Sequence, residues 1–243
     1  MVAPAIQAAA GAAPSGQTFT PGPILLMGPP GAGKGTQSKI LMAQWLVPQI
    51  STGDLLRGMR KDSEKSASPL GQEMRAVMND GHLIPNELVE AIVLDRLRQP
   101  DTKRGYILDG FPRTLPQAIW LDRELSAENE TLPIIAVNIQ VSYTKLLRRI
   151  TGRRSCPTCG RIYNIYFCLP EYETVCDVDG TALVQRPDDT EEVFAERMRT
   201  YDAMTAPVVE HYQGMARFAE VNGDLPVGEI TQAIMDAIVR LRS

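Results

Sequence analysis

A glycine-rich segment with one lysine lies close to the start of the chain, and its residue types suit phosphate binding. Four apolar residues, 24–27, lead into Gly28-Pro29-Pro30-Gly31-Ala32-Gly33-Lys34-Gly35-Thr36. Glycines let backbone N–H groups turn toward an anion, and the start of a following helix adds further donors. Lys34 can reach terminal phosphates, and Thr36 can face a magnesium ion or a phosphate oxygen. The pattern predicts a strand, a phosphate-binding loop and a helix over 34–45; the alternative is a Gly/Pro-rich surface loop.

A mostly apolar segment that ends in an acidic residue is the second candidate for chemistry. Residues 105–108 are followed by Asp109-Gly110-Phe111-Pro112-Arg113. Sheets of α/β proteins place ligands beyond the carboxyl ends of strands, so Asp109 could hold a magnesium-bound water. Arg113 follows on a Gly-Phe-Pro turn, where its guanidinium could bind phosphate through two hydrogen bonds. Taken alone, the segment could also be a plain turn.

Arginines occur at high density farther along the chain. Arg148, Arg149, Arg153 and Arg154 fall within seven residues, and Arg197 interrupts an apolar series at helical spacing. Guanidinium groups are well suited to binding phosphate oxygens. For each single arginine the alternative is an ordinary exposed position. The apolar series around Arg197 consists of Val193, Tyr201, Met204 and Val208.

All four cysteines fall between residues 156 and 176, and their spacing indicates a metal site rather than a disulfide framework. Cys156 and Cys159 form one closely spaced pair, Cys176 and Asp179 form another, and sixteen residues separate Cys159 from Cys176. Three thiolates and a carboxylate suit a tetrahedral structural zinc site. The alternative is a metal-free segment whose cysteines only pack together. Cys168 lies outside the pattern, and its spacing disfavours it as the fourth ligand.

These residues require a scaffold in which strand ends and helix starts meet. Apolar strand-like segments alternate with segments of helical periodicity, which predicts a parallel sheet with helices on both faces. We expect Asn86, Ser142 and Asp189 to cap helices, the last with Glu192 three residues later. Two insertions, near 51–80 and 153–189, interrupt the sheet. The expected strands are 24–27, 105–109, 134–139 and 218–221, and the expected helices include 34–45, 70–79, 87–98, 115–125 and 227–241.

Length, charge and composition limit the class of function. A chain of 243 residues can bury a large core. The net charge of −4 and the pI of about 5.3 disfavour nucleic acid or an anionic membrane as a partner. Residues 1–23 carry no charged side chain and lack the features of a targeting signal, so we expect a flexible tail and a cytoplasmic protein with reduced thiols. The two histidines, His82 and His211, lie in no catalytic pattern.

Together the motifs resemble those of the adenylate kinases, a group of nucleoside monophosphate kinases. The resemblance covers residues 24–242 and implies a five-stranded P-loop α/β fold with an AMP-binding insertion and a zinc-bearing lid. It implies a tail at 1–23, a core formed by 24–50, 81–152 and 190–243, an AMP-binding segment at 51–80 and a lid at 153–189. The four matching motifs are the loop 28–36, Ser51-Thr52-Gly53-Asp54-Leu55-Leu56-Arg57, Asp109–Arg113 with Gln117, and the cysteine segment.

The resemblance also implies the activity, which is reversible, direct in-line phosphoryl transfer from Mg-ATP to AMP to give two ADP. ATP, AMP and ADP would be the partners of a cytoplasmic monomer that binds neither nucleic acid nor membrane, and Mg²⁺ and a structural Zn²⁺ would be its cofactors. The catalytic groups would be Lys34, Arg113, Arg153, Arg186 and Arg197. ATP would contact Gly31, Ala32, Gly33, Lys34, Gly35, Thr36, Arg149, Arg153, Ile162, Tyr163 and Leu225. AMP would contact Thr52, Arg57, His82, Leu83, Ile84, Gly110, Phe111, Pro112, Arg113, Gln117, Arg186 and Arg197. Asp109 would hold magnesium through water, and the lid metal would be held by Cys156, Cys159, Cys176 and Asp179.

Two alternatives stay open at this point. Another nucleoside monophosphate kinase would share these motifs but accept UMP or CMP, or use GTP as the donor; Thr52 and Gln117 favour AMP. A zinc-ribbon ATPase that binds nucleic acid would also combine a phosphate loop with a zinc knuckle. The acidic balance of the chain and the Asp-Gly-Phe-Pro-Arg segment disfavour this second alternative.

Overall fold

The structure is a computed structural model that describes residues 19–53, 55, 72, 85–127 and 132–243. At its centre is a five-stranded sheet in the order β2-β3-β1-β4-β7. All four neighbouring pairs of strands run parallel, as predicted. The strands are β1 (Gly22–Met27), β2 (Gln49–Ser51), β3 (Gly105–Asp109), β4 (Ile135–Gln140) and β7 (Phe218–Asn222).

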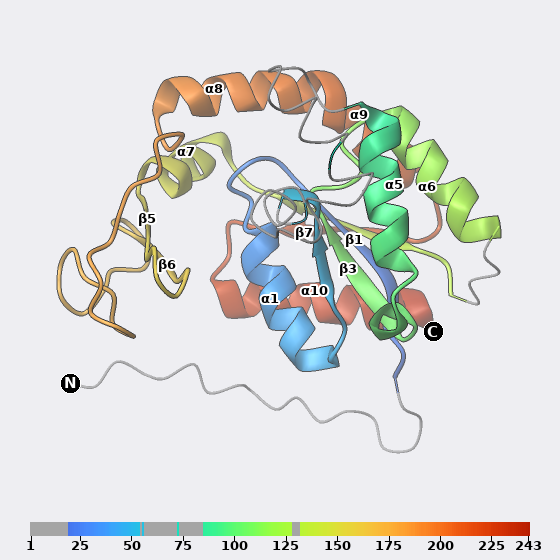
Figure 1. The fold of residues 1–243 in the computed structure, drawn as a ribbon, viewed down its shortest axis with the longest axis horizontal. Helices are drawn as coiled ribbons and strands as arrows, with labels where there is room; N and C mark the ends of the chain where they lie inside the picture. The colour runs from blue at the N-terminus through green and yellow to red at the C-terminus, as the bar shows by residue number, and fades with distance from the viewer. Residues whose placement is uncertain (1–18, 54, 56–71, 73–84, 128–131) are drawn as a thin grey trace.

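Helices cover both faces of the sheet (Figure 1), which confirms the predicted α/β fold class. In β1, Ile24 and Leu26 face one core while Leu25 and Met27 face the other, as the two-residue period of a strand requires. Of the described helices, none is long and apolar enough to cross a bilayer. The first core is covered by α1 (Lys34–Trp45), α7 (Tyr143–Thr151), α8 (Glu191–Thr200) and α10 (Val227–Arg242), and the second by α5 (Asn86–Leu97), α6 (Leu115–Ala127) and α9 (Ala206–Gln213). A short 3-10 turn (Pro100–Thr102) follows α5.

The strand register brings the predicted functional segments to one edge of the sheet. Asp109, at the end of β3, lies opposite Leu26 of β1 on one side and Ser51 of β2 on the other. Met27, the last residue of β1, pairs with Asn138 of β4. The loop after β1 and the turn after β3 therefore leave the sheet at its carboxyl edge, where α/β proteins bind ligands.

The predicted cap of α8 is wrong. Thr190 occupies the N-cap position, and its hydroxyl accepts a hydrogen bond from the N–H of Val193 at 3.3 Å. Asp189, the predicted cap, is fully buried, and its carboxylate is bound by the guanidinium of Arg153 instead. A charged, bidentate donor competes more strongly for a buried carboxylate than a backbone N–H does.

Two other expected caps make different contacts. Asn86 is the first residue of α5 rather than its cap, and its side-chain oxygen accepts from Gln117 Nε2 at 2.8 Å. Ser142 does occupy the N-cap position of α7, but its side chain makes no capping bond. Its hydroxyl donates to the carboxylate of Asp224 at 3.1 Å, because the turn after β7 lies beside it.

The long helix predicted after the lid consists of three parts. A π-helical segment, η2 (Tyr201–Thr205), separates α8 from α9. The N–H of Ala206 bonds to the carbonyl of Tyr201, which is the five-residue spacing of a π-helix. Pro207 has no N–H to continue the regular ladder, so the register changes just before it. The predicted apolar series does not form one buried stripe, since Val208 is fully buried whereas Met204 is 48% exposed.

The boundary predicted for the N-terminal tail is also too late. Gly22 and Pro23 belong to β1, and Phe19 packs on Trp45 of α1 with 5.6 Å between ring centroids. A Cβ on Gly105 would lie 2.4 Å from the carbonyl oxygen of Gly22, so glycine permits this close pairing at the start of the sheet. Residues 19–23 are therefore part of the folded core, and residues 1–18 lie outside the described part of the chain.

The segment between α7 and α8 forms a small unit with its own core. β5 (Arg153–Ser155) and β6 (Ile162–Asn164) pair antiparallel there, at the left of Figure 1. Its apolar core consists of Cys156, Tyr163 and Cys176, with Leu183 packed against them. A core of so few apolar side chains contributes little stability. The unit therefore needs another source of stability. The predicted AMP-binding segment 51–80, including the predicted helix 70–79, lies largely outside the described residues.

Arg242 provides a test of how the last helix holds the sheet. Its guanidinium donates to the carbonyl oxygens of Pro21 at 2.7 Å and Pro23 at 2.8 Å, and also to that of Pro133. We expect Arg242→Ala to lower the free energy of unfolding by about 1.5–3 kcal/mol, the usual contribution of a hydrogen bond to a charged group. Urea unfolding followed by circular dichroism measures this. Arg240→Ala, at an exposed position of the same helix, should change it by less than about 0.5 kcal/mol, and equal effects would contradict the assignment.

Candidate active site

The predicted phosphate loop lies between the end of β1 and the start of α1. Gly33 occupies the N-cap of α1 with a φ of 100°, and its carbonyl accepts from the N–H of Thr36 at 3.0 Å. At Gly28 the φ is 139°, and a Cβ there would lie 2.7 Å from the carbonyl oxygen of Ile139. Glycine therefore lets the loop pack directly on β4. The unpaired N–H groups of the first turn of α1 and its dipole favour an anion above the loop.

Lys34 folds back over this loop. Its ammonium group donates to two carbonyl oxygens of the loop, at 2.6 and 3.1 Å. Although the whole side chain is only half-buried, desolvation of the ammonium lowers the pKa of Lys34 from 10.5 to about 8. The charge of Asp109 opposes this lowering of the pKa, while those of Arg113 and Arg197 add to it. Three charged side chains from separate elements are therefore close enough to act on Lys34.

Asp109 lies beside the first turn of α1. Its Oδ2 accepts from Gln49 Nε2 at 2.9 Å and is 3.4 Å from the position that a Cβ would take on Gly35. The sequence analysis missed Gln49, which orients this carboxylate from the neighbouring strand β2. In the sequence, Gln49 is marked only as a polar residue two positions before Ser51. Its role becomes visible once β2 is seen to pair with β3.

The turn after β3 fixes Arg113. The carbonyl oxygen of Gly110 accepts from both the Thr52 hydroxyl at 2.9 Å and Arg113 Nε at 2.8 Å. Phe111 and Pro112 between them are buried, so the turn is anchored in the core. The exposed guanidinium of Arg113 is thus held at its base and projects from a rigid turn, next to Thr52.

Gln117 is only 5% exposed and connects three elements. Its Oε1 accepts from the N–H of Arg113, and its Nε2 donates to Asn86, both at 2.8 Å. The carboxamide thus holds the turn after β3 against α5, and its predicted role in reading the base of AMP stays a prediction. Four further predicted AMP contacts lie outside the described residues: Arg57, His82, Leu83 and Ile84.

Arg149, in the last turn of α7, bridges the phosphate loop and the turn after β7. It donates to the carbonyl oxygens of Ala32 at 3.1 Å and Gly223 at 2.7 Å. Leu225, two residues after Gly223, packs against the first core. Arg149 therefore ties the predicted phosphate loop to the turn that leads to Leu225, so two predicted ATP contacts from distant parts of the sequence are connected.

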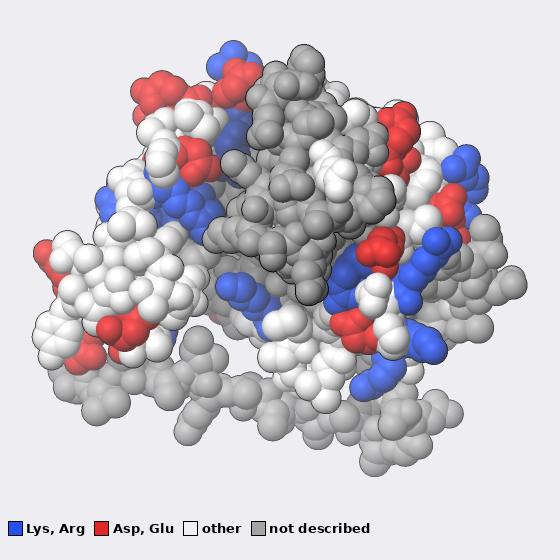
Figure 2. Space-filling model, in the orientation of Figure 1, with Lys and Arg blue, Asp and Glu red and all other residues white. Residues whose placement is uncertain are grey.

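The remaining predicted arginines come from the lid and from α8. Arg153 is paired with Asp189, Arg186 Nε lies 3.3 Å from the hydroxyl of Ser155, and Arg197 pairs with Asp188 at 3.2 Å. Figure 2 shows Lys and Arg side chains gathered below α8, where α7 leads into the lid. Arg197 also acts on the pKa of Lys34 and so connects α8 to the phosphate loop. These contacts of Arg153 and Arg186 are instead with residues of the same segment, 153–189.

The predicted metal ligands come together. One ligand atom from each of Cys156, Cys159, Cys176 and Asp179 lies within 4.8 Å of the others. The two closest sulfurs, of Cys159 and Cys176, are 3.5 Å apart, and Cys156 Sγ lies 3.4 Å from the Asp179 oxygens. Zinc–sulfur bonds of about 2.3 Å in a tetrahedron place sulfurs roughly 3.8 Å apart, so the cluster is close to the spacing that zinc requires. Cys168 stands outside it and is exposed, as expected.

Two similar turns build the cluster. In one, the N–H of Gly160 bonds to the carbonyl of Cys156 at 3.1 Å, and in the other that of Gly180 bonds to Cys176 at 2.8 Å. The φ angles of Gly160 and Gly180 are 72° and 67°, and a Cβ at either would meet nothing within 4 Å. The left-handed backbone, rather than space, therefore calls for glycine here. Hydrogen bonds from Thr181 to Asp179 lower the pKa of its carboxyl, which keeps it ionised as a metal ligand must be.

Tyr163 serves the metal cluster rather than the surface. Its side chain is 1% exposed, its hydroxyl lies 3.5 Å from Cys176 Sγ, and it accepts from the N–H of Asp177 at 2.9 Å. Burial raises the pKa of Tyr163 to about 12, so the hydroxyl stays protonated and can donate to a ligand sulfur. The predicted contact of Tyr163 with ATP stays a prediction. Ile162 beside it is 43% exposed and stays a predicted contact.

Comparison with known proteins identifies the family. The family model described as adenylate kinase matches residues 26–217. The chain belongs to the adenylate kinase family. It is 44% identical over 211 residues to an adenylate kinase of Nitrosococcus oceani, covering 86% of this chain and 95% of that protein. It is 42% identical over 217 residues to an adenylate kinase of Desulforudis audaxviator, covering 89% and 99%, and 41% identical over 212 residues to one of Lachnospira eligens, covering 87% and 97%.

Membership of the adenylate kinase family confirms the resemblance found in the sequence and identifies the chain as a phosphotransferase that acts on nucleotides. The nucleic-acid-binding ATPase is not favoured. The arrangement suits such an enzyme, because the charges of Asp109, Arg113 and Arg197 all act on Lys34 at the edge where the phosphate loop leaves the sheet.

The low pKa of Lys34 predicts how ATP binding depends on pH. At pH 7 most of the free enzyme already carries the charge on Lys34, so affinity should fall by only about twofold between pH 7 and 8. Above pH 8 the free enzyme has lost this proton and must take it up on binding, so affinity should fall by up to about tenfold per pH unit. Equilibrium binding of a non-hydrolysable ATP analogue between pH 7 and 10 measures this. Lys34→Arg stays charged throughout and should give a flat profile; a flat wild-type profile would contradict the prediction.

Proposed function

We propose that this chain transfers the terminal phosphoryl group of Mg-ATP to AMP, reversibly and in line, to give two ADP. The observation that carries the proposal is that Arg113 and Arg197, from separate elements, both lie close enough to Lys34 of the phosphate loop for their charges to lower its pKa. The attacking and leaving oxygens both belong to nucleotides, so no protein nucleophile is required. Catalysis then depends on positioning the two nucleotides and on stabilising charge.

On the donor side, the backbone of the phosphate loop and the start of α1 would bind the ATP phosphates. Arg149 and Leu225 would border the rest of the nucleotide, since they meet the loop at Ala32 and at the turn after β7. Asp109 would hold Mg²⁺ through water, as hard carboxylate oxygens suit that ion. When bound with ATP, Mg²⁺ neutralises charge on the phosphate oxygens.

On the acceptor side, Arg113 would bind the AMP phosphate with its exposed guanidinium, and Thr52 and the turn at Gly110 would lie against the same nucleotide. The support for this is the rigidity of the turn, in which Gly110 accepts from both Thr52 and Arg113. A preorganised guanidinium loses little freedom on binding. Arg186 would join Arg153 and Arg197 around the migrating group when the lid closes and excludes water.

We also propose that the cluster of Cys156, Cys159, Cys176 and Asp179 holds a structural Zn²⁺. The support is the donor set, its spacing and the small apolar core of the lid. A monomeric state and a cytoplasmic location are further proposals that rest on the sequence and on the reduced state of the four cysteines. Light scattering after size-exclusion chromatography would determine the oligomeric state.

The arginine assignment is tested by alanine variants. We expect Arg113→Ala and Arg197→Ala each to lower kcat by at least about a hundredfold, because a guanidinium that stabilises a transferring phosphoryl contributes on the order of 10³–10⁵ in related enzymes. The rate of ADP formation from Mg-ATP and AMP measures this. Arg199→Ala, which removes an exposed arginine of the same helix as Arg197, is the control and should keep near-wild-type turnover. Wild-type rates in Arg113→Ala or Arg197→Ala would overturn the roles.

The same assay with each nucleoside monophosphate in turn tests the acceptor. Fast diphosphate formation with AMP alone would support the proposal. Preference for UMP or CMP would keep the phosphotransfer mechanism but exclude AMP specificity, and replacing ATP by GTP would test the donor base in the same way. A protein that transfers to none of these acceptors would contradict the proposed function.

The zinc proposal is tested by removing one ligand. We expect Cys156→Ser and chelation of the wild-type protein to lower the melting temperature by roughly 4–8 °C, the shift that about 2 kcal/mol gives in a chain of this size. Kinetic constants of the protein that stays folded should change much less. Elemental analysis should find one zinc in the wild type and in Cys168→Ser, whose cysteine lies outside the cluster. An unchanged melting temperature after complete metal removal would refute a structural metal.

A further inference from the structure

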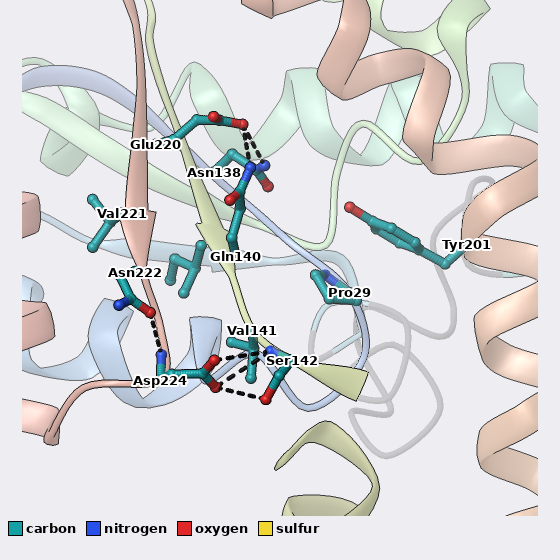
Figure 3. Close-up of a pocket in the computed structure, with 11 residues that line it drawn as sticks. Pro29, Asn138, Gln140, Val141, Ser142, Tyr201, Glu220, Val221, Asn222 and Asp224 are labelled. Atoms are coloured by element: carbon teal, nitrogen blue, oxygen red, sulfur yellow. Dashed lines mark hydrogen bonds between the residues drawn. The ribbon is translucent and has the colours of Figure 1, made fainter. Parts of the chain in front are cut away.

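A cavity of about 600 Å³ opens at the carboxyl ends of β4 and β7, and neither nucleotide is assigned to it. Figure 3 shows Asn138 and Gln140 side by side next to Glu220, with Tyr201 of η2 on the opposite side and its hydroxyl pointing toward them. The cavity meets the phosphate loop only at Pro29, the end of the loop away from the start of α1. Its volume lies in the range of small-molecule sites.

Most polar atoms on the wall of this cavity are acceptors. Glu220 Oε1 already accepts from Asn138 Nδ2 at 3.3 Å and from Gln140 Nε2 at 2.6 Å. These two bonds fix the orientation of the Asn138 carboxamide, because turning it over would bring two oxygens together. Asn138 is 6% exposed, and its Oδ1 is buried without any hydrogen-bond partner. A buried acceptor left unpaired is unfavourable, and an N–H donor from a ligand would relieve it.

The charge of the cavity is negative. Two carboxylates, of Glu220 and Asp224, stand at its two ends in Figure 3. Of the described residues, those that line the cavity include neither Lys nor Arg. The nearby Lys145 donates to the backbone carbonyl of Asp224 rather than to its carboxylate. The ring of Tyr201 adds a surface that attracts cations.

These features exclude some ligands and favour others. A phosphate or a nucleotide would meet two carboxylates in a wall that holds neither Lys nor Arg among the described lining residues, although the charge of Asp224 also acts on the pKa of Arg149. The cavity therefore differs in kind from the nucleotide site. A tightly bound metal ion is disfavoured. Among the described residues, three or more possible His, Cys, Asp or Glu ligands come together at the lid cluster but not at this cavity. A linear cation with N–H donors at both ends would meet Glu220 and Asn138 at one end and Asp224 at the other.

We propose that this cavity is a second binding site, separate from the nucleotide site, for a small linear diamine or polyamine cation. One ammonium group donates to Asn138 Oδ1 and pairs with Glu220, and the other pairs with Asp224. The methylene chain lies along Val141 and Val221, and the Tyr201 ring covers it. The site does not depend on the phosphotransfer assignment.

Calorimetric titration with 1,4-diaminobutane, at pH 7.5 and 150 mM salt, tests the proposal. The full chain is used without nucleotide, because polyphosphates themselves bind diamines. We expect one diamine per chain and at least tenfold weaker binding in Glu220→Gln. Glu210→Gln removes the same charge from an exposed position of α9 outside the cavity and should bind as the wild type does. The uncharged 1,4-butanediol should not bind.

Side-chain amide NMR signals locate the ligand even if Glu220→Gln folds poorly. The NH₂ signals of Asn138 and Gln140 should shift on addition of diamine, and Asn138→Leu, which removes the unpaired acceptor, should weaken binding severalfold. No binding to the wild type would overturn the proposal. Equal binding to Glu220→Gln and Glu210→Gln, or unchanged Asn138 and Gln140 signals, would also overturn it, since the diamine would then be attracted by general surface charge.

Discussion

Burial of the Lys34 ammonium among other charged groups is the constraint that the rest of the structure must accommodate, because desolvation lowers its pKa more than the charge of Arg113 or of Arg197 does. Arg113 and Arg197 both lower the pKa of Lys34, so the three cations destabilise one another before any phosphate arrives. Hydrogen bonds and an ion pair hold each of them in place: Arg113 bonds to Gly110, Arg197 pairs with Asp188, and Lys34 bonds to the loop carbonyls. Among the described residues, the anion that acts on the pKa of Lys34 is Asp109. The free-energy cost of holding these cations together is therefore offset by folding, before any polyphosphate binds.

A parallel sheet meets this requirement because it brings the ends of strands far apart in sequence to one edge. That part of the structure could be predicted from local patterns. The helix Lys34–Trp45 and the strand Gly105–Asp109 have the predicted bounds, and glycines and charged residues mark the start of the helix and both ends of the strand. The cysteine cluster was equally accessible, because the ligand spacing lies within two short turns whose glycines need left-handed backbone.

What the sequence did not reveal depends on partners that are distant along the chain. Asp189 looked like a helix cap until Arg153, 36 residues earlier, was placed beside it. Gln49 had no visible role until β2 paired with β3, and the burial of Tyr163 against Cys176 was not visible in the sequence. Local propensity predicts where an element starts, but the competition between several donors for one buried acceptor is decided by the tertiary structure.

The two arginine pairs at the lid hinge differ in what they allow Arg153 and Arg197 to do. The pair of Arg197 with Asp188 is exposed on both sides, at 41% and 53%, so exchanging the carboxylate for a phosphate costs little. Asp189 is 0% exposed, and removing Arg153 from it would leave a buried charge unpaired, which costs about 3–5 kcal/mol. Arg153 binds Asp189 through Nε and Nη2 only, and a guanidinium has five N–H donors. In its proposed role Arg153 would therefore reach a nucleotide through Nη1 while keeping the Asp189 carboxylate, and the joint between β5 and α8 would stay intact during the proposed closure of 153–189.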